Sequence, residues 1–219
     1  MARKLLFFGV RLFEGLGMVG SDAGKRGNFK MSHARISTEK QAGTPCPMPE
    51  NEEFRLEVLH SHAILNTPPE VQFDRIARLA SVHFRVPMAV IAMIDADRMW
   101  CKASSGVELK EAPREDTFCA HTINETGVMM VPDAAKDSRF KDNPFVVGEF
   151  GLRFYVGAPL ITREGAVLGA LCLLDTYPRQ FFSPEDRQYL TDLADVIVDQ
   201  MEMRRALLSE MRDDMYMLD

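Results

Sequence analysis

The spacing of apolar residues divides the chain into helical and extended segments. Apolar positions fall near one helical face over residues 52–65, which predicts a first helix. Thr67 is the predicted N-cap of a second helix, which ends near residue 84 and carries an apolar stripe at helical spacing. The period then changes. Residues 86–94 are almost wholly apolar and predict a buried strand, whereas residues 98–103 alternate and predict a half-exposed antiparallel partner.

The second half of the chain predicts more strands and a long terminal helix. The expected segments are a short helix over 117–125, a strand over 128–131, a connection over 132–152, paired strands over 153–162 and 166–175, and a helix from 183 to about 215. Gly165 suits a hairpin position that needs positive φ, and Ser183 with Asp186 predicts a capping box. Many hairpins and few long crossovers predict an α+β fold, with one central antiparallel sheet of about five to six strands and helices packed on it.

Composition adds a domain plan. Residues 15–50 show no periodicity and are rich in Gly, Lys, Ser, Thr and Pro, so residues 1–50 are expected to be a flexible leader, with Met31 as an alternative start. The domain is expected over 51–202, and 203–219 should extend the last helix.

The net charge is −6 although the leader has a basic excess, so the folded part is acidic, which argues against nucleic acid. Since no apolar run reaches the ~18 residues of a membrane span, we expect a cytoplasmic protein without membrane contact.

The cysteines offer the first candidate chemistry. Cys46, Cys101, Cys119 and Cys172 form no CxxC pair, which is typical of reduced thiols in a cytosolic protein. Cys119 precedes His121 by two residues, a pattern that suggests a thiolate activated by an imidazole. Because residues two apart do not share a helical face, a core cysteine beside a capping or surface histidine is the favoured interpretation. Cys101 and Cys172, in apolar strands, are interpreted as structural.

Other polar patterns predict no complete catalytic or metal site. His60 and His62 lie two apart on one helix and are interpreted, with His83, as surface histidines, so no metal or cofactor is predicted. Asp133 and Asp137 are interpreted as Asx-turn and cap residues. The sequence has no phosphate-binding loop, nucleophile elbow or dinucleotide fingerprint. These observations predict a binding module and not an enzyme.

The segment over 66–202 resembles a GAF domain of the kind found in bacterial signalling proteins. The resemblance is carried by Leu65-Asn-Thr-Pro-Pro69, Phe73-Asp74, Trp100-Cys-Lys-Ala-Ser-Ser-Gly106, Pro113-Arg-Glu-Asp-Thr-Phe-Cys-Ala-His-Thr-Ile123, Val131-Pro-Asp133, Asp137-Ser-Arg-Phe140, Asn143-Pro144, Arg153-Phe-Tyr-Val-Gly-Ala-Pro-Leu160 and Leu168-Gly-Ala-Leu-Cys-Leu-Leu-Asp175. It implies a GAF-like fold with a pocket between the sheet and the loop helices. Some members bind small molecules there, and others dimerise and relay signals.

The resemblance also raises two specialised functions. Some GAF-like proteins reduce free methionine sulfoxide with cysteines clustered at the pocket. Cys119 lies near one such position, but residues 132–152 contain no cysteine. Bilin-binding members attach their chromophore through a cysteine after the long loop, where residues 145–155 have none. A thiol enzyme that uses Cys119 therefore remains an alternative, and a covalent bilin is not expected.

A pocket is expected around the long connection, where aromatic residues cluster. The candidate ligand-binding residues are Phe118, Cys119, Asp133, Phe140, Phe145, Phe154 and Tyr155. Tyr155 offers a hydroxyl that could orient a non-covalent small molecule. The sequence does not distinguish a cyclic nucleotide, an amino acid, a redox species or no ligand, and a loop pinned to the sheet by aromatic packing is an equal alternative.

The last helix predicts an interface. Its heptad-like seam, with one break at Arg204, consists of Leu190, Ala194, Ile197, Met201, Arg204, Leu208, Met211 and Met215. We expect a homodimer through this helix and a separate output protein such as a histidine kinase or a cyclase. The leading hypothesis is a sensory or regulatory module in signal transduction. The alternatives are the thiol enzyme and a ligand-free dimerisation scaffold.

Overall fold

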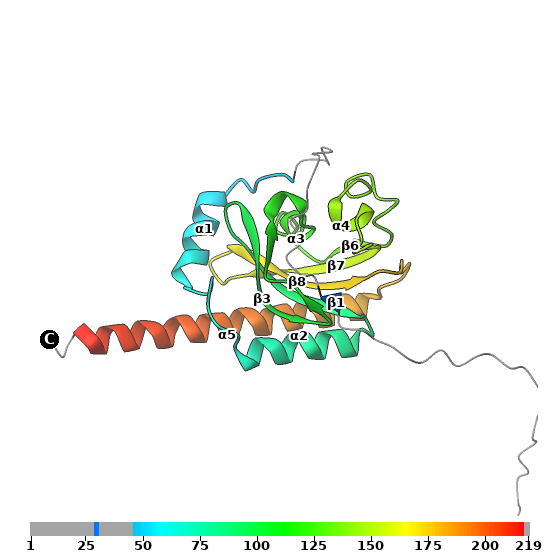
Figure 1. The fold of residues 1–219 in the computed structure, drawn as a ribbon. Coiled ribbons are helices and arrows are strands. Elements are labelled where there is room, and N and C mark those ends of the chain that lie inside the picture. Colours follow the sequence, from blue (N-terminus) through cyan, green and yellow to red (C-terminus); the bar gives the residue numbers. More distant parts are fainter. Residues whose placement is uncertain (1–28, 31–45, 217–219) are drawn as a thin grey trace, which may run out of the picture.

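The computed structural model describes residues 29–30 and 46–216, with side chains described over 46–211 (Figure 1). Most of the expected leader, and the side chain of Met215 in the predicted seam, therefore lie outside the described residues. The described part of the leader includes a two-residue strand, β1 (Phe29–Lys30), which pairs in parallel with β4 (Val107–Glu108).

The fold is built on a six-stranded sheet in which every pairing is antiparallel. In spatial order its strands are β5 (Glu111–Pro113), β3 (Arg98–Ser105), β2 (Met88–Ile94), β8 (Val167–Asp175), β7 (Phe154–Ile161) and β6 (Met129–Val131). The expected α+β fold with five to six antiparallel strands is confirmed. The sequence did not predict β4 and β5, because strands of two or three residues carry no readable period.

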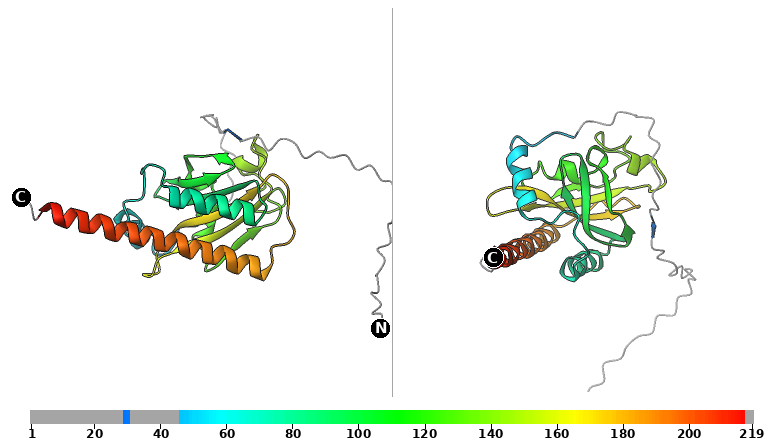
Figure 2. Two further views of the ribbon diagram at one scale, coloured as in Figure 1. Left: turned by 90° about the horizontal axis from the view of Figure 1, so that it is seen from below. Right: turned by 60° about the vertical axis from the view of Figure 1, so that its left-hand side comes forward.

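Helices cover the two faces of the sheet unequally. They are α1 (Glu52–Ser61), α2 (Val71–His83), the 3-10 turn η1 (Arg114–Asp116), α3 (Cys119–Thr122), α4 (Pro144–Val147) and α5 (Pro184–Tyr216). The two longest, α2 and α5, lie side by side under one face, whereas the four-residue helices α3 and α4 lie over the other (Figures 1 and 2). One face is thus covered by regular helices and the other by short helices and loops.

The start of the last helix is as predicted, and that of α2 is not. The Ser183 hydroxyl accepts from the Asp186 N–H at 3.0 Å, and the Asp186 carboxylate accepts from the Ser183 N–H at 3.1 Å, so the capping box is confirmed. Thr67 does not cap α2, which begins at Val71. The Thr67 hydroxyl instead donates to the Ile64 carbonyl at 2.6 Å, closing the turn between the two helices.

Strand β3 departs from the predicted alternation. The ladder pairs Ile91 with Ala103 and then Ala92 with Cys101, so Lys102 is an extra, bulged residue. Its side chain is buried. The ammonium donates to the Thr67 hydroxyl at 2.8 Å, to the Pro68 carbonyl and to the Glu70 carboxylate. The alternation predicted over residues 98–103 therefore fails at Lys102, where these acceptors compensate for the buried charge.

Two apolar clusters fill the two faces of the sheet. The first joins α1, α2 and α5 to side chains of the sheet that include Ile91, Phe154, Val156, Leu171 and Leu173. We call this the helical face. The second lies under α3 and α4 and contains alternating residues of the same strands, such as Val90, Tyr155 and Cys172. We call this the loop face. Successive side chains of β7 and β8 thus point alternately into the two layers, as the period of two in a strand requires.

The predicted dimer seam of the last helix is largely an intramolecular surface. Leu190, Ala194, Ile197 and Met201 are buried in the helical face of their own domain. Arg204, interpreted as a break, donates to the Glu70 carboxylate at 3.1 Å and to the carbonyls of His62 and Ala63. The seam is therefore not the dimer surface over these residues, because it packs on the sheet and on α2. Leu208 and Met211, further along the seam, are exposed.

Candidate functional site

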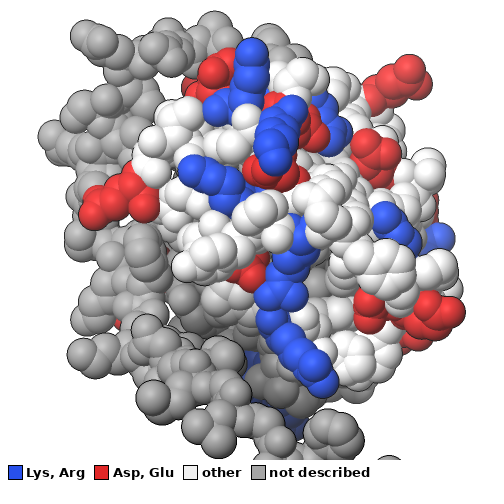
Figure 3. All heavy atoms as spheres, turned by 90° about the vertical axis from the view of Figure 1, so that its right-hand side faces the viewer, with Lys and Arg blue, Asp and Glu red and all other residues white. Residues whose placement is uncertain are grey.

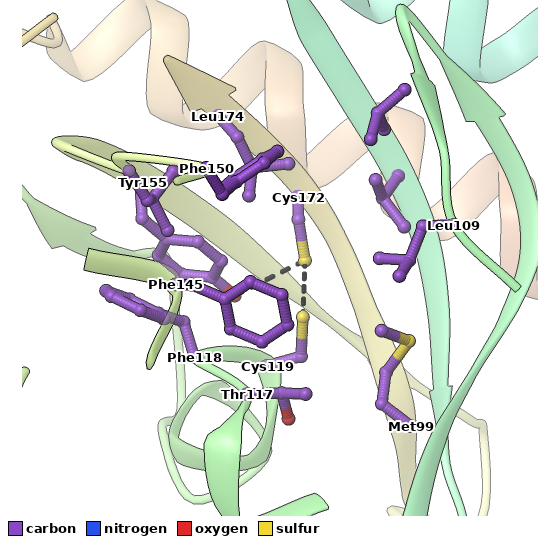
Figure 4. Close-up of a pocket in the computed structure, with 13 residues that line it drawn as sticks. Met99, Leu109, Thr117, Phe118, Cys119, Phe145, Phe150, Tyr155, Cys172 and Leu174 are labelled. Carbon is purple, nitrogen blue, oxygen red and sulfur yellow. Dashed lines mark hydrogen bonds between the residues drawn. The ribbon is translucent and has the colours of Figure 1, made fainter. Parts of the chain in front are cut away.

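A cavity of about 40 Å³ lies on the loop face, between the sheet and the covering segments (Figure 4). Its walls come from β2, β3, β4, β7 and β8, from α3 and α4, and from the connections between these elements. The lining residues are Val90, Met99, Val107, Leu109, Thr117, Phe118, Cys119, Phe145, Phe150, Leu152, Tyr155, Cys172 and Leu174. Leu109, Phe150 and Leu174 are partly exposed, so the cavity approaches the surface beside them.

The covering wall is held by hydrogen bonds within the long connection. The Asn143 side chain accepts from the Phe145 N–H at 2.9 Å and donates to the Asp116 carbonyl at 2.8 Å. The Leu152 N–H donates to the Phe145 carbonyl at 2.8 Å. These bonds fix Phe145 and Leu152 in the wall and tie α4 to the segment that leads into α3. These hydrogen bonds explain why the connection is ordered despite its length, as is usual for long loops that form a binding site.

The hydroxyl of Tyr155, a residue that lines the cavity, is held in place by its neighbours. Its side chain is fully buried, and the ring follows its own strand so closely that a Cβ on Gly157 would lie 2.3 Å from the hydroxyl oxygen. The hydroxyl lies 2.6 Å from the Thr122 hydroxyl and 3.3 Å from the Cys172 sulfur. Gly157 therefore makes room for a phenol that links α3 to β8. Burial raises the pKa of Tyr155 well above its ordinary value, so the phenol is neutral.

Two thiols meet beside this phenol. The sulfur of Cys119, at the start of α3, lies 3.1 Å from the sulfur of Cys172 in β8 (Figure 4). The hydrogen bond from Cys172 lowers the pKa of Cys119, while burial raises the pKa of Cys172 well above that of a free thiol. Cys119 is therefore the member of the pair that more readily carries a thiolate, and Cys172 the one that keeps its proton.

Four of the seven residues expected to bind a ligand line this cavity: Phe118, Cys119, Phe145 and Tyr155. Phe140 lies behind the wall, stacked on Phe118 with ring centroids 3.9 Å apart.

Two predicted positions are elsewhere. Phe154 belongs to the helical face, because it is the neighbour of Tyr155 on a strand and points the other way. Asp133 lies in a turn, where it accepts from the Ala135 N–H and pairs with Lys136 at 2.9 Å. The Asx-turn interpretation of Asp133 and of Asp137, which accepts from the Arg139 N–H, is confirmed.

The sequence missed Cys172 as a cavity residue. It was interpreted as structural because it stands in an apolar strand. The register pairs Cys172 with Val90 on one side and with Gly157 on the other, which puts its side chain in the same layer as Tyr155. The alternation of side chains along β7 and β8 indicates which residues of each strand share a face. Which face of β8 meets the Tyr155 side of β7 depends on the strand register, and the sequence does not supply that register.

The histidines do not join the cysteines. His121 packs edge-on against Phe140 with ring centroids 4.7 Å apart, while the Cys119 sulfur contacts Cys172, so the two side chains have different partners, as the favoured interpretation of the Cys119–His121 pattern expected. His121 is buried, however, so its interpretation as a surface residue was wrong. Burial, followed by the nearby Arg139 charge, lowers the pKa of His121. His62 is fully buried and its Nδ1 lies 2.8 Å from the Val58 carbonyl, so describing it as a surface residue was wrong. Within the described residues, no cluster of His, Cys, Asp or Glu could hold a metal ion.

The charge around the site restricts what can enter it. None of the thirteen lining residues is a lysine, arginine, histidine, aspartate or glutamate. A phosphate, a free amino acid or another ion would enter such a cavity without a partner for its charge, at a large desolvation cost. On the side of the molecule that Figure 3 shows, basic side chains run down the middle of the described surface, and acidic side chains lie above and beside them.

An ionic network anchors the segment that leads into the site. The Glu52 carboxylate bridges two buried guanidinium groups, accepting from Arg55 at 2.7 Å and 2.9 Å and from both terminal nitrogens of Arg114. Arg55 also donates to the Ile94 carbonyl at 2.6 Å. Burial alone would raise the pKa of Glu52, but the hydrogen bonds from the two arginines hold it at about 2. The network ties α1 to β2 and to η1, just before Thr117 and Phe118.

An antiparallel sheet with long helices on one face and a loop-covered cavity on the other defines a small α+β domain built around a pocket. A family model described as GAF domain matches residues 68–200, and the chain belongs to the GAF domain family. It is thus a domain of the signalling kind, as the resemblance implied. No described helix combines the length and the apolar character that crossing a membrane requires.

Individual relatives agree with this family. The chain is 38% identical over 160 residues to the cyclic di-GMP phosphodiesterase PA2567 of Pseudomonas aeruginosa, an alignment that covers 73% of this chain and 27% of that protein. The chain therefore matches about a quarter of this relative's length.

Solved structures show the same fold at low identity. One is the GAF domain of an Acinetobacter phosphoenolpyruvate-protein phosphotransferase, with a TM-score of 0.51, 17% identity, and coverage of 71% of this chain and 98% of that one. Another is the free methionine-R-sulfoxide reductase of Neisseria meningitidis with its substrate, with a TM-score of 0.52, 17% identity, and coverage of 74% and 96%.

Proposed function

We propose that this GAF domain is a sensory module whose cavity takes up a small, uncharged molecule. The observation that carries the proposal is the cavity of about 40 Å³ on the loop face, with an entirely uncharged lining and the hydroxyls of Thr117 and Tyr155 as orienting groups. A ligand of a few heavy atoms fits without rearrangement. A larger one must displace α4 and the loop around it, and that displacement would be the signal.

The sheet offers a direct route from the cavity to the last helix. Tyr155 and Cys172 face the cavity, while their chain neighbours Val156, Leu171 and Leu173 face the cluster that includes α5. A ligand that shifts β7 or β8 would therefore also move the side chains on which α5 packs, because these belong to the adjacent residues of the same strands. Its effect on α5 is limited to the difference between its affinities for the two arrangements.

Relay through a dimer would use a stripe of α5 other than the predicted seam. Tyr189, Val196, Met203 and Leu207 are exposed apolar residues at heptad-like spacing. On α2, the helix that lies beside α5 (Figure 2), Val71, Leu79 and Val82 are also exposed. We call these seven residues the outer stripe. We propose that it pairs with a second copy of the chain in the cytoplasm and passes the signal to an output enzyme such as a histidine kinase, a cyclase or, by analogy with the relative, a cyclic di-GMP phosphodiesterase.

The alternative of a methionine sulfoxide reductase has one supporting observation, the pair of thiols in the cavity. The uncharged lining opposes it, because a free amino acid brings both an ammonium and a carboxylate. Turnover of free methionine sulfoxide by the wild-type chain, lost on Cys119→Ser, would favour the enzyme over the sensor.

Native mass spectrometry of the purified full chain tests the sensory proposal. We expect an extra small mass under gentle conditions that is released on denaturation. Leu109→Trp, which fills the mouth of the cavity, should lose that mass, whereas Leu79→Trp on the exposed outer stripe should keep it. A mass retained equally by both variants would place the ligand elsewhere, and an empty wild-type chain would favour the ligand-free scaffold.

A further inference from the structure

We propose that Cys119 and Cys172 form a redox pair that a hydroperoxide entering the cavity converts to a disulfide. The proposal goes beyond the sensory function and does not rest on a non-covalent ligand, because the thiols themselves are the reacting groups. They come from different elements, α3 and β8, and their sulfur atoms lie 3.1 Å apart. A disulfide bond is about 2.05 Å long, so about 1 Å of relative movement would join them.

The two sulfurs are not equivalent, and their difference assigns the roles. Cys119, at the start of α3, keeps 7% of its surface exposed, whereas Cys172 in β8 keeps none, so Cys119 is the more accessible of the two. The hydrogen-bonding contact between the two sulfurs also lowers the pKa of Cys119, which favours its thiolate. Cys172 is completely buried, and burial keeps it protonated. Cys119 is therefore the attacking thiol, and Cys172 is the resolving thiol that waits beside it.

The cavity provides the approach. Both cysteines line it, and its volume of about 40 Å³ exceeds the space that one water molecule needs, about 10–15 Å³. A hydroperoxide is small and uncharged, which matches a lining without charged side chains. The Tyr155 hydroxyl, 3.3 Å from the Cys172 sulfur and 2.6 Å from the Thr122 hydroxyl, supplies a polar group beside the reacting atoms.

The reaction balances in two steps. The Cys119 sulfur attacks one oxygen of the hydroperoxide, the O–O bond breaks, and the other oxygen leaves with a proton as an alcohol, or as water when the oxidant is hydrogen peroxide. Cys119 is then a sulfenic acid. The Cys172 sulfur next attacks the Cys119 sulfur, the S–O bond breaks, and hydroxide leaves with the Cys172 proton as water. The two thiols together lose two electrons, which the peroxide gains.

The product would change the covering wall of the cavity. The bond ties the first residue of α3 to the centre of β8, where Cys172 pairs with Val90 and Gly157. It also removes the thiol proton that Cys172 shares with its neighbours. Oxidation would therefore link α3 covalently to the sheet on the loop face. No residue of the helical face would take part in the reaction.

The two other cysteines provide matched comparisons. Burial raises the pKa of Cys101 to about 12 and that of Cys46 to about 11, so neither favours a thiolate although both are partly exposed. Exposure alone would favour oxidation of Cys46 and Cys101, whereas the proposal favours the two buried thiols. Which cysteines are oxidised therefore distinguishes a specific redox pair from unspecific oxidation of the more exposed thiols.

The test uses the full chain, first reduced and then treated with hydrogen peroxide. After quenching, the chain is denatured, its remaining thiols are alkylated, and the peptides are mapped by mass spectrometry. We expect a Cys119–Cys172 disulfide, with Cys46 and Cys101 alkylated. Four alkylated thiols, a disulfide that uses Cys46 or Cys101, or a Cys119 sulfinic acid without a disulfide would overturn the proposal.

Variants test the roles. With dimedone present, Cys172→Ala should accumulate a sulfenic acid adduct on Cys119, and Cys119→Ala should give none on Cys172. Cys101→Ala is the matched control and should form the disulfide at the wild-type rate. An adduct on Cys172 in Cys119→Ala, or loss of the disulfide in Cys101→Ala, would contradict the assignment. The wild-type map decides the main question even if a variant fails to fold.

Discussion

The two faces of the sheet differ in how they are covered. On the helical face, α2 and α5 present long apolar stripes, and the side chains of the sheet interdigitate with them in a filled core. On the loop face, α3 and α4 have four residues each and are joined by loops, so the cover cannot follow the sheet closely. The result is a cavity that contains the thiols and the tyrosine. The same strands thus supply structural stability on one side and chemistry on the other.

The largest expected effect compares neighbours on β8. Leu173 is buried in the helical face, whereas Leu174 is half-buried and lines the cavity. We expect Leu173→Ala to lower the free energy of unfolding by about 2–5 kcal/mol because it opens a void in a filled core. Leu174→Ala should cost only about 1–2 kcal/mol, since this side chain already lacks some contacts. Denaturant unfolding of both variants measures the difference, and equal losses would contradict the distinction between the faces.

Gly157 tests how tightly the loop face holds its tyrosine. An added Cβ would meet the Tyr155 hydroxyl at 2.3 Å and the Thr122 hydroxyl at 2.9 Å, so the phenol must move. We expect Gly157→Ala to destabilise the domain by about 1–3 kcal/mol. Gly127→Ala is the control, since nothing lies within 4 Å of its added Cβ. Thermal unfolding compares the two, and a neutral Gly157→Ala would show that Tyr155 is not confined as described.

Glu52 tests the anchor that leads into the loop face. Its pKa in the folded protein, about 2, lies below the ordinary carboxyl value of 4.5, so its stabilising contribution is fully present above pH 4.5 and is lost as the pH falls through about 2. We expect Glu52→Gln to cost about 1–2 kcal/mol at neutral pH, a value reduced for partial solvent screening. The variant should lose less stability than the wild type on acidification.

Glu53→Gln, an exposed neighbour in the same helical turn, provides the control. Its unfolding free energy should stay within about 0.5 kcal/mol of the wild type. Similar acid profiles for Glu52→Gln and the wild type would contradict the role of the network.

The smallest expected effect on folding concerns the outer stripe. Met203 is 59% exposed, so Met203→Glu should leave the unfolding free energy of the monomer within about 0.5 kcal/mol of the wild type. It should nevertheless weaken self-association, because it places a charge in a proposed apolar interface. Sedimentation at several concentrations measures this, with Val147→Glu on α4 as an exposed apolar control. A wild-type monomer, or a dimer indifferent to Met203→Glu, would contradict the interface.

The sequence predicted the helical face better than the loop face. The stripes of α2 and α5 and the Ser183 capping box follow from spacing within one segment, and they were found. The seam of α5 was read correctly as apolar, but its first part, from Leu190 to Met201, packs on its own domain and not on a partner, since periodicity does not say what a face packs against. Lys102 and Cys172 were misjudged because a bulge and a strand register decide their positions. Such pairings join distant segments, and no local pattern encodes them.

Xenon tests the central claim that the loop face, and not the helical face, is the binding side. Apolar cavities bind xenon, and methyl resonances report its position residue by residue. Under xenon pressure, we expect the methyl signals of Val90, Leu109 and Leu174 to shift, while those of Leu173 and Ile197 stay in place. Shifts confined to Leu173 and Ile197, or no shift at all, would contradict the account.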